Sequence, residues 1–336
     1  MALFHGSKYM KTGKISENVL KRSVLKRCKS GREEVAQGPG IGQDCAIIRS
    51  EGSTFTVMHT QTFTAERMEK IRYAVIDGVN NLCCAGAEAV SVMLAVMLPE
   101  DREEDCLRAV MDSADAACQE CGVQLAGGHT EVSAAVQQPV ITVTAQGFAL
   151  KEFHRTADVR TDLELVMAGF PGMEGTALLA REKEEELKKR FPLELVENAM
   201  EFDRDLCRQE AVRIGWECGA AAMHDVSQGG VFGALWEFLE SNGTGMEADL
   251  RKIPIRQETI EICEIYGWNP YQLLSGGCIL MAVPDGQKVT DHLEASGICA
   301  KVIGRTTAKK EKVLRNGEEM RFLDKPAQDE IEKLKF

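Results

Sequence analysis

The chain has 336 residues, of which 44% are hydrophobic, and a formal net charge of −12 at pH 7. This length suits two ordinary domains, and the mixed composition suits a globular protein with a sizeable core. The negative charge argues against non-specific nucleic-acid binding, which needs clustered lysine and arginine, and no apolar run is long enough to span a bilayer. We therefore expect a cytoplasmic protein with neither a nucleic-acid nor a membrane partner.

The first half of the chain predicts strands and helices in an order typical of an α+β domain. Ser16 is placed to cap a first short helix. The run Val90–Leu98 is almost continuously apolar, which predicts a strand buried on both faces. The other expected elements are strands at 45–48, 55–59, 123–126 and 140–148, and helices at 66–87 and 101–122.

The second half restarts the same plan after a charged, irregular stretch at 151–162. This stretch is the best candidate for a boundary, so we expect domains at 1–155 and 156–336. The expected elements are strands at 163–168, 278–283 and 300–303, and helices at 176–190, 206–219, 229–239, 289–295 and 328–335. Both halves are therefore predicted to be α+β.

A glycine-rich loop at 37–44 is the first candidate for a binding site. Gly38, Gly40 and Gly42 leave it without side-chain bulk, and Asp44 follows them directly. Glycine lets the backbone approach a ligand closely, and successive free N–H groups can form a nest for a phosphate. A carboxylate beside a phosphate typically holds Mg²⁺. The alternative is a simple turn that enters a strand.

Four later stretches carry further glycine, histidine, amide and acidic residues. They are 80–87, 127–132, 223–230 and 274–277. In this order and spacing, the five stretches resemble the aminoimidazole ribonucleotide synthase-related (PurM-like) superfamily. That superfamily includes HypE-type hydrogenase maturation factors, thiamine-monophosphate kinase and selenophosphate synthetase, and the chain looks closest to a HypE-like subgroup.

The resemblance implies a two-domain PurM-like fold, with an N-terminal sheet domain that dimerises and a C-terminal α+β domain. It implies ATP and Mg²⁺ in a cleft between the domains, close to a dimer interface. The ATP would phosphorylate or dehydrate an oxygen of an unknown small-molecule or protein substrate, with hydrogenase maturation as one candidate process. Phosphoryl transfer of this kind depends on positioning and on metal-assisted charge stabilisation.

The same resemblance assigns roles by position. The nucleotide-binding residues would be Gly38, Gly40, Gly42, Asp44, Asn80, Asn81, Gly128, His129, Thr130 and Gly229. The metal ligands would be Asp44, Asp225 and Glu131, and the catalytic residues would be Asp225 and His224. Either histidine could instead bond backbone in a turn, and Asp225 could be only a helix cap.

Three positions depart from the family pattern. Gln43, Gln61 and Asn81 stand where the family keeps acidic residues. Each change replaces an anionic ligand with a neutral amide, which should weaken a Mg²⁺ site severely. We therefore expect weak or metal-independent nucleotide binding. The alternative function is a degenerate relative that acts as a nucleotide-binding or scaffold protein without turnover.

The end of the sequence bears on the same choice. HypE factors end in a cysteine that carries the group being dehydrated, whereas this sequence ends at Phe336. The difference argues against conversion of a carbamoyl group to cyanide.

The twelve cysteines look like a disulfide set until their placement is considered. Most lie among apolar neighbours, and Cys118 and Cys121 have no second pair to complete a zinc site. With no signal peptide, buried free thiols are expected. A redox pair of Cys118 and Cys121 is the alternative.

A homodimer is expected from the two strands at 90–98 and 140–148. Their apolar faces exceed what the helices of one small domain would cover.

Overall fold

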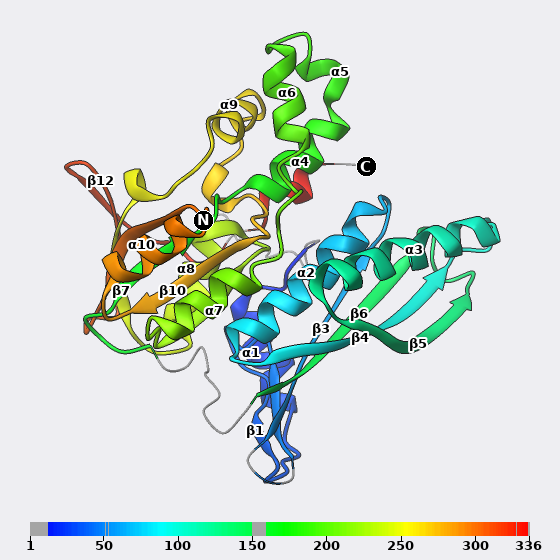
Figure 1. The fold of residues 1–336 in the computed structure, drawn as a ribbon, viewed down its shortest axis with the longest axis horizontal. Helices are drawn as coiled ribbons and strands as arrows, with labels where there is room; N and C mark the ends of the chain where they lie inside the picture. Colours follow the sequence, from blue (N-terminus) through cyan, green and yellow to red (C-terminus); the bar gives the residue numbers. More distant parts are fainter. Residues whose placement is uncertain (1–12, 51, 53, 150–158, 327, 335–336) are drawn as a thin grey trace, which may run out of the picture.

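The structure is a computed structural model that describes residues 13–50, 52, 54–149, 159–326 and 328–334. Two α+β domains lie side by side, each with one mixed sheet and its covering helices (Figure 1). The prediction of a two-domain α+β chain is confirmed. The expected boundary at 155 lies outside the described residues, as does the first part of the stretch at 151–162.

The N-terminal sheet has six strands in the order β1-β2-β3-β6-β4-β5. Its pairs are antiparallel except for β4 with β5. The strands are β1 (Val35–Gln37), β2 (Ala46–Arg49), β3 (Phe55–Thr64), β4 (Glu88–Leu98), β5 (Gln124–Val132) and β6 (Val140–Ala149). The helices are α1 (Glu17–Ser23), a 3₁₀ turn (Leu25–Arg27), α2 (Glu69–Cys84) and α3 (Glu104–Cys121).

Helices α2 and α3 cover one face of this sheet (Figure 1). Ile71 and Leu82 of α2 pack with Val92 and Ile141 of the sheet, and all four are fully buried. The alternation of buried and exposed residues along β6 directs every second side chain to this core.

The other face of the sheet stays open in the single chain. Met93 on β4 is 48% exposed and Phe148 on β6 is 44% exposed. Thr60 and Thr144 share a 3.0 Å hydrogen bond across this open face. The prediction that Val90–Leu98 is buried on both faces is therefore wrong for one chain, because both helices pack on the same side.

The C-terminal sheet has seven strands in the order β13-β12-β9-β11-β7-β10-β8. Its strands are β7 (Glu164–Ala168), β8 (Ala222–Val226), β9 (Gly245–Asp249), β10 (Cys278–Val283), β11 (Ala300–Thr307), β12 (Lys312–Asn316) and β13 (Glu319–Phe322). Its helices are α4 (Met173–Glu182), α5 (Glu184–Leu187), α6 (Leu193–Met200), α7 (Gln209–Glu217), α8 (Gly230–Glu240), α9 (Gln257–Tyr266) and α10 (Gly286–Ala295). Three 3₁₀ turns lie at Leu250–Lys252, Pro270–Gln272 and Glu330–Lys333.

Helices cover both faces of this second sheet. Leu165 and Met167 of β7 pack toward α8, while Val166 and Ala168 pack toward α7 and α10. The central strands are consequently buried on both sides, and all six residues of β10 are buried.

Two helix predictions need correction. The helix expected at 176–190 is broken at Lys183 into α4 and α5. The helix expected at 328–335 is only a 3₁₀ turn over Glu330–Lys333 within the described residues, where Asp329 accepts a hydrogen bond from the Ile331 N–H.

Candidate functional site

The glycine-rich loop joins β1 to β2 and reaches across to the C-terminal domain. Gly42 has a φ of +63°, and a Cβ built there would lie 2.6 Å from the carbonyl oxygen of Glu237 on α8. A side chain at this position would be strained and would also collide with the backbone. The loop therefore depends on Gly42 to pack against the other domain.

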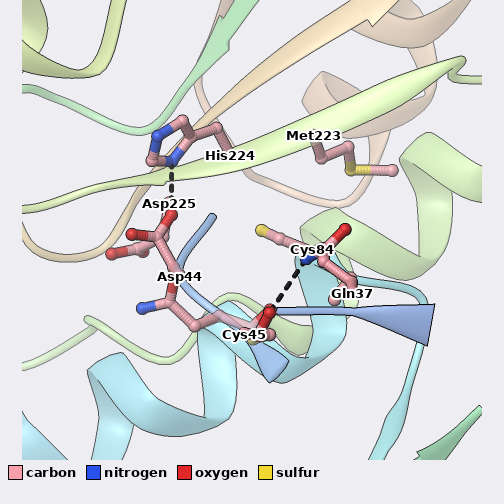
Figure 2. A pocket seen from close by; sticks show the side chains of 9 residues that line it. Gln37, Asp44, Cys45, Cys84, Met223, His224 and Asp225 are labelled. Atoms are coloured by element: carbon pink, nitrogen blue, oxygen red, sulfur yellow. Dashed lines mark hydrogen bonds and ion pairs between the residues drawn. The ribbon is translucent and has the colours of Figure 1, made fainter. Parts of the chain in front are cut away.

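This contact brings Asp44 to His224 from opposite domains. The Asp44 Oδ2 lies 3.6 Å from Nδ1 of His224, at the wall of a small recess (Figure 2). The backbone oxygen of Asp44 also lies 2.8 Å from Nδ1 of His59 on β3. Burial would raise the pKa of the Asp44 carboxyl, but the nearby charges of His224, Lys14 and His59 outweigh it and hold the pKa below its ordinary value. Asp44 is thus held as a carboxylate.

Asp225 follows His224 near the end of β8, and its pKa is shifted in the direction opposite to that of Asp44. Its side chain is 2% exposed, and neither carboxylate oxygen has a hydrogen-bond partner within 3.5 Å among the described residues, although the more distant Ser227 and Asn80 side chains lower its pKa slightly. Burial raises the pKa of Asp225 well above its ordinary value, and the negative charges of Asp77 and Asp44 raise it further. A buried carboxyl without a partner is costly, so its position indicates a ligand or a proton that completes it.

Two further buried acids lie beside this group and were not identified from the sequence. Asp77 on α2 is 9% exposed, and burial raises its pKa to about 7. Glu174 at the start of α4 is 3% exposed and accepts a 2.9 Å hydrogen bond from the Gly276 N–H. Burial and the charge of Asp77 raise the pKa of Glu174 as well. The detectable signal was an aspartate on the apolar face of α2, one helical turn before Asn81.

These residues line two adjoining hollows between the domains. The smaller, of about 140 Å³, is lined by Asp44, His59, Asn81, His224 and Asp225, among others. The larger, of about 720 Å³, is lined by Asp77 and Glu174, among others. Lys14, Gln61, Ser227 and Gln228 line both. The volume of the larger hollow is within the range of pockets that hold small ligands.

Asn80 and Gly229, which were assigned to nucleotide binding, make hydrogen bonds within the chain and line neither hollow. The Asn80 side chain donates to the Leu206 carbonyl at 3.0 Å and accepts from the Arg208 N–H at 2.8 Å, so it joins the two domains. The N–H of Gly229, before α8, donates to the Asp329 carboxylate at 2.6 Å. Asn81, in contrast, lines the smaller hollow and donates to the Asp77 carbonyl at 2.9 Å.

The Gly-Gly-His-Thr-Glu stretch lies apart from both hollows. Gly128, His129, Thr130 and Glu131 are exposed residues of β5, the edge strand of the N-terminal sheet. His129 Nε2 lies 3.2 Å from Glu131 Oε2. His129 pairs with Ala95 on β4, on the same open face as Met93. One chain therefore brings Asp44, His224 and Asp225 together, but not the residues of β5.

Lys14 supplies the cationic side of the hollows. Its Nζ lies 2.6 Å from the Glu237 carboxylate, and it lines both cavities. Lys11, three positions before Lys14, lies outside the described residues.

Two features are absent from the part of the chain that the structure describes. No group of three or more histidine, cysteine or acidic side chains is arranged to hold a metal ion. No helix is long and apolar enough to cross a membrane.

Two family models match the chain. Residues 42–149 match AIR synthase related protein, N-terminal domain, and residues 161–316 match AIR synthase related protein, C-terminal domain.

Curated relatives align with about two thirds of the chain. A Methanocaldococcus jannaschii protein named for hydrogenase expression and formation is 27% identical over 241 residues, 70% of either chain. Carbamoyl dehydratase HypE of Rhodobacter capsulatus is 26% identical over 246 residues, 70% of this chain and 69% of its own.

Solved structures share the fold over almost the whole chain. A HypE chain from a HypE–HypF complex superposes with a TM-score of 0.74 at 19% identity, covering 91% of this chain and 99% of that one. AaThiL complexed with AMPPCP and TMP gives a TM-score of 0.72 at 20% identity, covering 94% and 99%.

Proposed function

The chain belongs to the AIR synthase related family, and from this premise we propose that it binds ATP in the hollows between its two domains. One observation carries the proposal: the unpartnered, buried Asp225 carboxyl faces an interdomain cavity that Asp44 reaches from the other domain. The structural relative AaThiL is complexed with AMPPCP, an ATP analogue, which supports a nucleotide as the ligand.

A divalent cation fits the donor set. Asp44 and Asp225 offer carboxylate oxygens, which are the ligands that Mg²⁺ prefers, and Mg²⁺ usually needs only one or two of them beside phosphate oxygens. Mg²⁺ would neutralise charge on the phosphates. Gln43, Gln61 and Asn81 contribute only neutral amides, and the Gln61 amide already donates to the Ala74 carbonyl at 3.0 Å. We therefore expect a weak dependence of ATP binding on Mg²⁺.

The second substrate would occupy the larger hollow. Asp77 is placed there, and a carboxyl with a pKa of about 7 suits the acceptance of a proton from a hydroxyl or amide group at neutral pH. His224 and Asp44 would position the phosphates. Hydrogenase maturation, named in the relatives, is the process in which we place this chemistry.

A second candidate function is a binding or scaffold protein without turnover. Two observations favour it. Three neutral amides stand at positions where the family keeps acidic residues. The Asp329 carboxylate already accepts a hydrogen bond from the N–H of Gly229. A phosphate could reach this N–H only by displacing Asp329.

We also propose a homodimer through the open face of the N-terminal sheet. Met93 and Phe148 are each more than two fifths exposed on that face. His129 lies on the same face, so pairing of two chains there would turn β5 toward the partner. Gly128, Thr130 and Glu131 could then join a site only as residues of a second copy.

The test is a calorimetric titration of ATP with and without Mg²⁺. Asp225→Asn should weaken ATP binding in the presence of Mg²⁺ about tenfold or more, because the site loses a carboxylate that would hold the cation beside the phosphates. Asp249→Asn is the matched control, since Asp249 pairs with Arg251 at 2.8 Å, outside both hollows. Equal affinity of both variants and the parent would contradict the proposed site. Binding without any ADP formation would favour the scaffold function.

A further inference from the structure

Two cysteines from different domains lie in contact in an apolar cluster of the domain interface, which also contains Tyr73 and Leu178 from the lining of the larger hollow. Cys121 is the last residue of α3, and Cys207 lies between α6 and α7. The Cys121 thiol donates to the sulfur of Cys207, with a sulfur–sulfur distance of 3.8 Å. Neither lines the two hollows.

The backbone around both sulfurs is fixed by cross-domain hydrogen bonds. The Gln209 amide donates to the Cys121 carbonyl at 2.8 Å. Asn80 bonds both Leu206 and Arg208, the two neighbours of Cys207. The guanidinium of Arg72 donates to the Asp203 carbonyl at 2.7 Å. The sulfurs, 3.8 Å apart, need to approach by under about 2 Å to reach the bonded distance of about 2.05 Å.

The two thiols have different chemical characters. Cys207 is partly exposed and accepts hydrogen bonds from the Cys121 thiol and from the Gln209 amide at 3.4 Å. These donors lower the pKa of the Cys207 thiol to about 6. Cys121 is 5% exposed, and its pKa is raised, chiefly by the hydrogen bond it donates to Cys207. Cys207 is thus the attacking thiolate and Cys121 the resolving thiol.

The sequence had suggested Cys118 as the partner of Cys121. Cys118 is 1% exposed and lies on the face of α3 that packs in the core of the N-terminal domain. A pair within one helix would also leave the two domains independent of each other. The cross-domain pair differs because it spans 86 positions of the chain and both halves of the fold.

We propose that Cys121 and Cys207 form a reversible disulfide that ties the two domains together when a low-molecular-weight disulfide oxidises them. The Cys207 thiolate attacks one sulfur of the small disulfide, and one small thiolate leaves. Cys121 then loses its proton to solvent and attacks the Cys207 sulfur, which expels the second small thiol. The protein loses two hydrogens, and the small disulfide is reduced to two thiols.

The bond would restrict the motion of the two domains relative to each other, and with it the opening of the interdomain hollows. It would also close a long loop in the unfolded chain, and such loops gain the most from a disulfide. We expect oxidation to raise the melting temperature by about 5 °C.

The test uses oxidised glutathione on the full chain, with free thiols then blocked and peptides mapped by mass spectrometry without reduction. The expected result is one linked peptide pair containing Cys121 and Cys207, and ten free thiols left of the twelve. Cys207→Ser should abolish both the link and the shift in melting temperature, whereas Cys118→Ser should leave both unchanged.

Alkylation of the parent provides a second readout if Cys207→Ser does not fold. Cys207 should be the first cysteine alkylated by iodoacetamide at pH 7. A link between Cys118 and Cys121, a link between Cys207 and any cysteine other than Cys121, or retention of all thiols under the oxidising conditions would each overturn the proposal.

Discussion

Replacement of Asp77 by asparagine should change the stability of the protein in a pH-dependent way. Relative to the parent, the variant should gain stability as the pH rises from 5 to 8. Burial raises the pKa of Asp77 from 3.8 to about 7, and the side chain is only 9% exposed. The charge of Asp77 in turn raises the pKa values of Glu174 and Asp225 in the other domain. Asparagine keeps the shape and polarity of the side chain but removes the charge.

The direction of this pH dependence follows from proton linkage. A carboxyl whose folded-state pKa lies above its unfolded-state value favours unfolding progressively as the pH rises between those two values. For Asp77 this window extends from pH 3.8 to about pH 7. Each pKa unit is equivalent to about 1.4 kcal/mol, so the parent loses about 4 kcal/mol over the whole window and about 3 kcal/mol between pH 5 and pH 8.

The assay compares thermal melts of the parent and Asp77→Asn at pH 5 and pH 8. For a chain of this length, about 3 kcal/mol is equivalent to a shift of about 4 °C in favour of the variant at pH 8, beyond its difference at pH 5. Asp249→Asn is the control, because the Arg251 guanidinium lowers the pKa of Asp249 to about 2 and no titration falls in this range. The same difference at both pH values would refute the account of Asp77 as a buried proton acceptor.

Three other predictions address the loop, the metal ligand and the dimer. Asp44→Asn should weaken ATP or Mg²⁺ binding in calorimetry with little change in melting temperature, whereas a lower melting temperature with unchanged binding would make Asp44 structural. Gly42→Ala should lower the free energy of unfolding by about 1–3 kcal/mol more than Gly267→Ala in denaturant titrations. Both glycines have a φ of +63°, but only a Cβ added at Gly42 would lie 2.6 Å from a backbone oxygen. The parent should be a dimer by light scattering at micromolar concentration and Phe148→Asp a monomer, and a monomeric parent would contradict the open-face interface.

The two-domain fold could be predicted from the sequence because strand alternation and helix periodicity are both local patterns. Alternating strands such as Val140–Ala149 and periodic helices such as α2 direct their own apolar faces. The elements that were missed include the short α6, the helix α9, and the strands β1, β8, β9, β12 and β13. Their assignment depends on neighbours far along the chain, as for β12, which pairs with β9 in parallel.

The site was predictable only in part, for the same reason. The glycine loop and the segment ending in Asp225 carry motifs, and the structure brings Asp44 within 3.6 Å of His224. Asp77 and Glu174 carry no motif, and the fold alone places both carboxyl groups beside Gly276, Asp77 from α2 of one domain and Glu174 from α4 of the other. The cysteine pair shows the same limit: spacing suggested Cys118 for Cys121, but the second domain supplies Cys207.

Amide hydrogen exchange of the full chain with and without saturating ATP and Mg²⁺ tests the central claim most directly. We predict slower exchange in the loop at 37–45 and in the segment at 223–230, which approach each other from the two domains. Exchange in α9, which does not line the hollows, should be unchanged. Protection that avoids both the loop and the segment, or its complete absence, would contradict a nucleotide site between the domains.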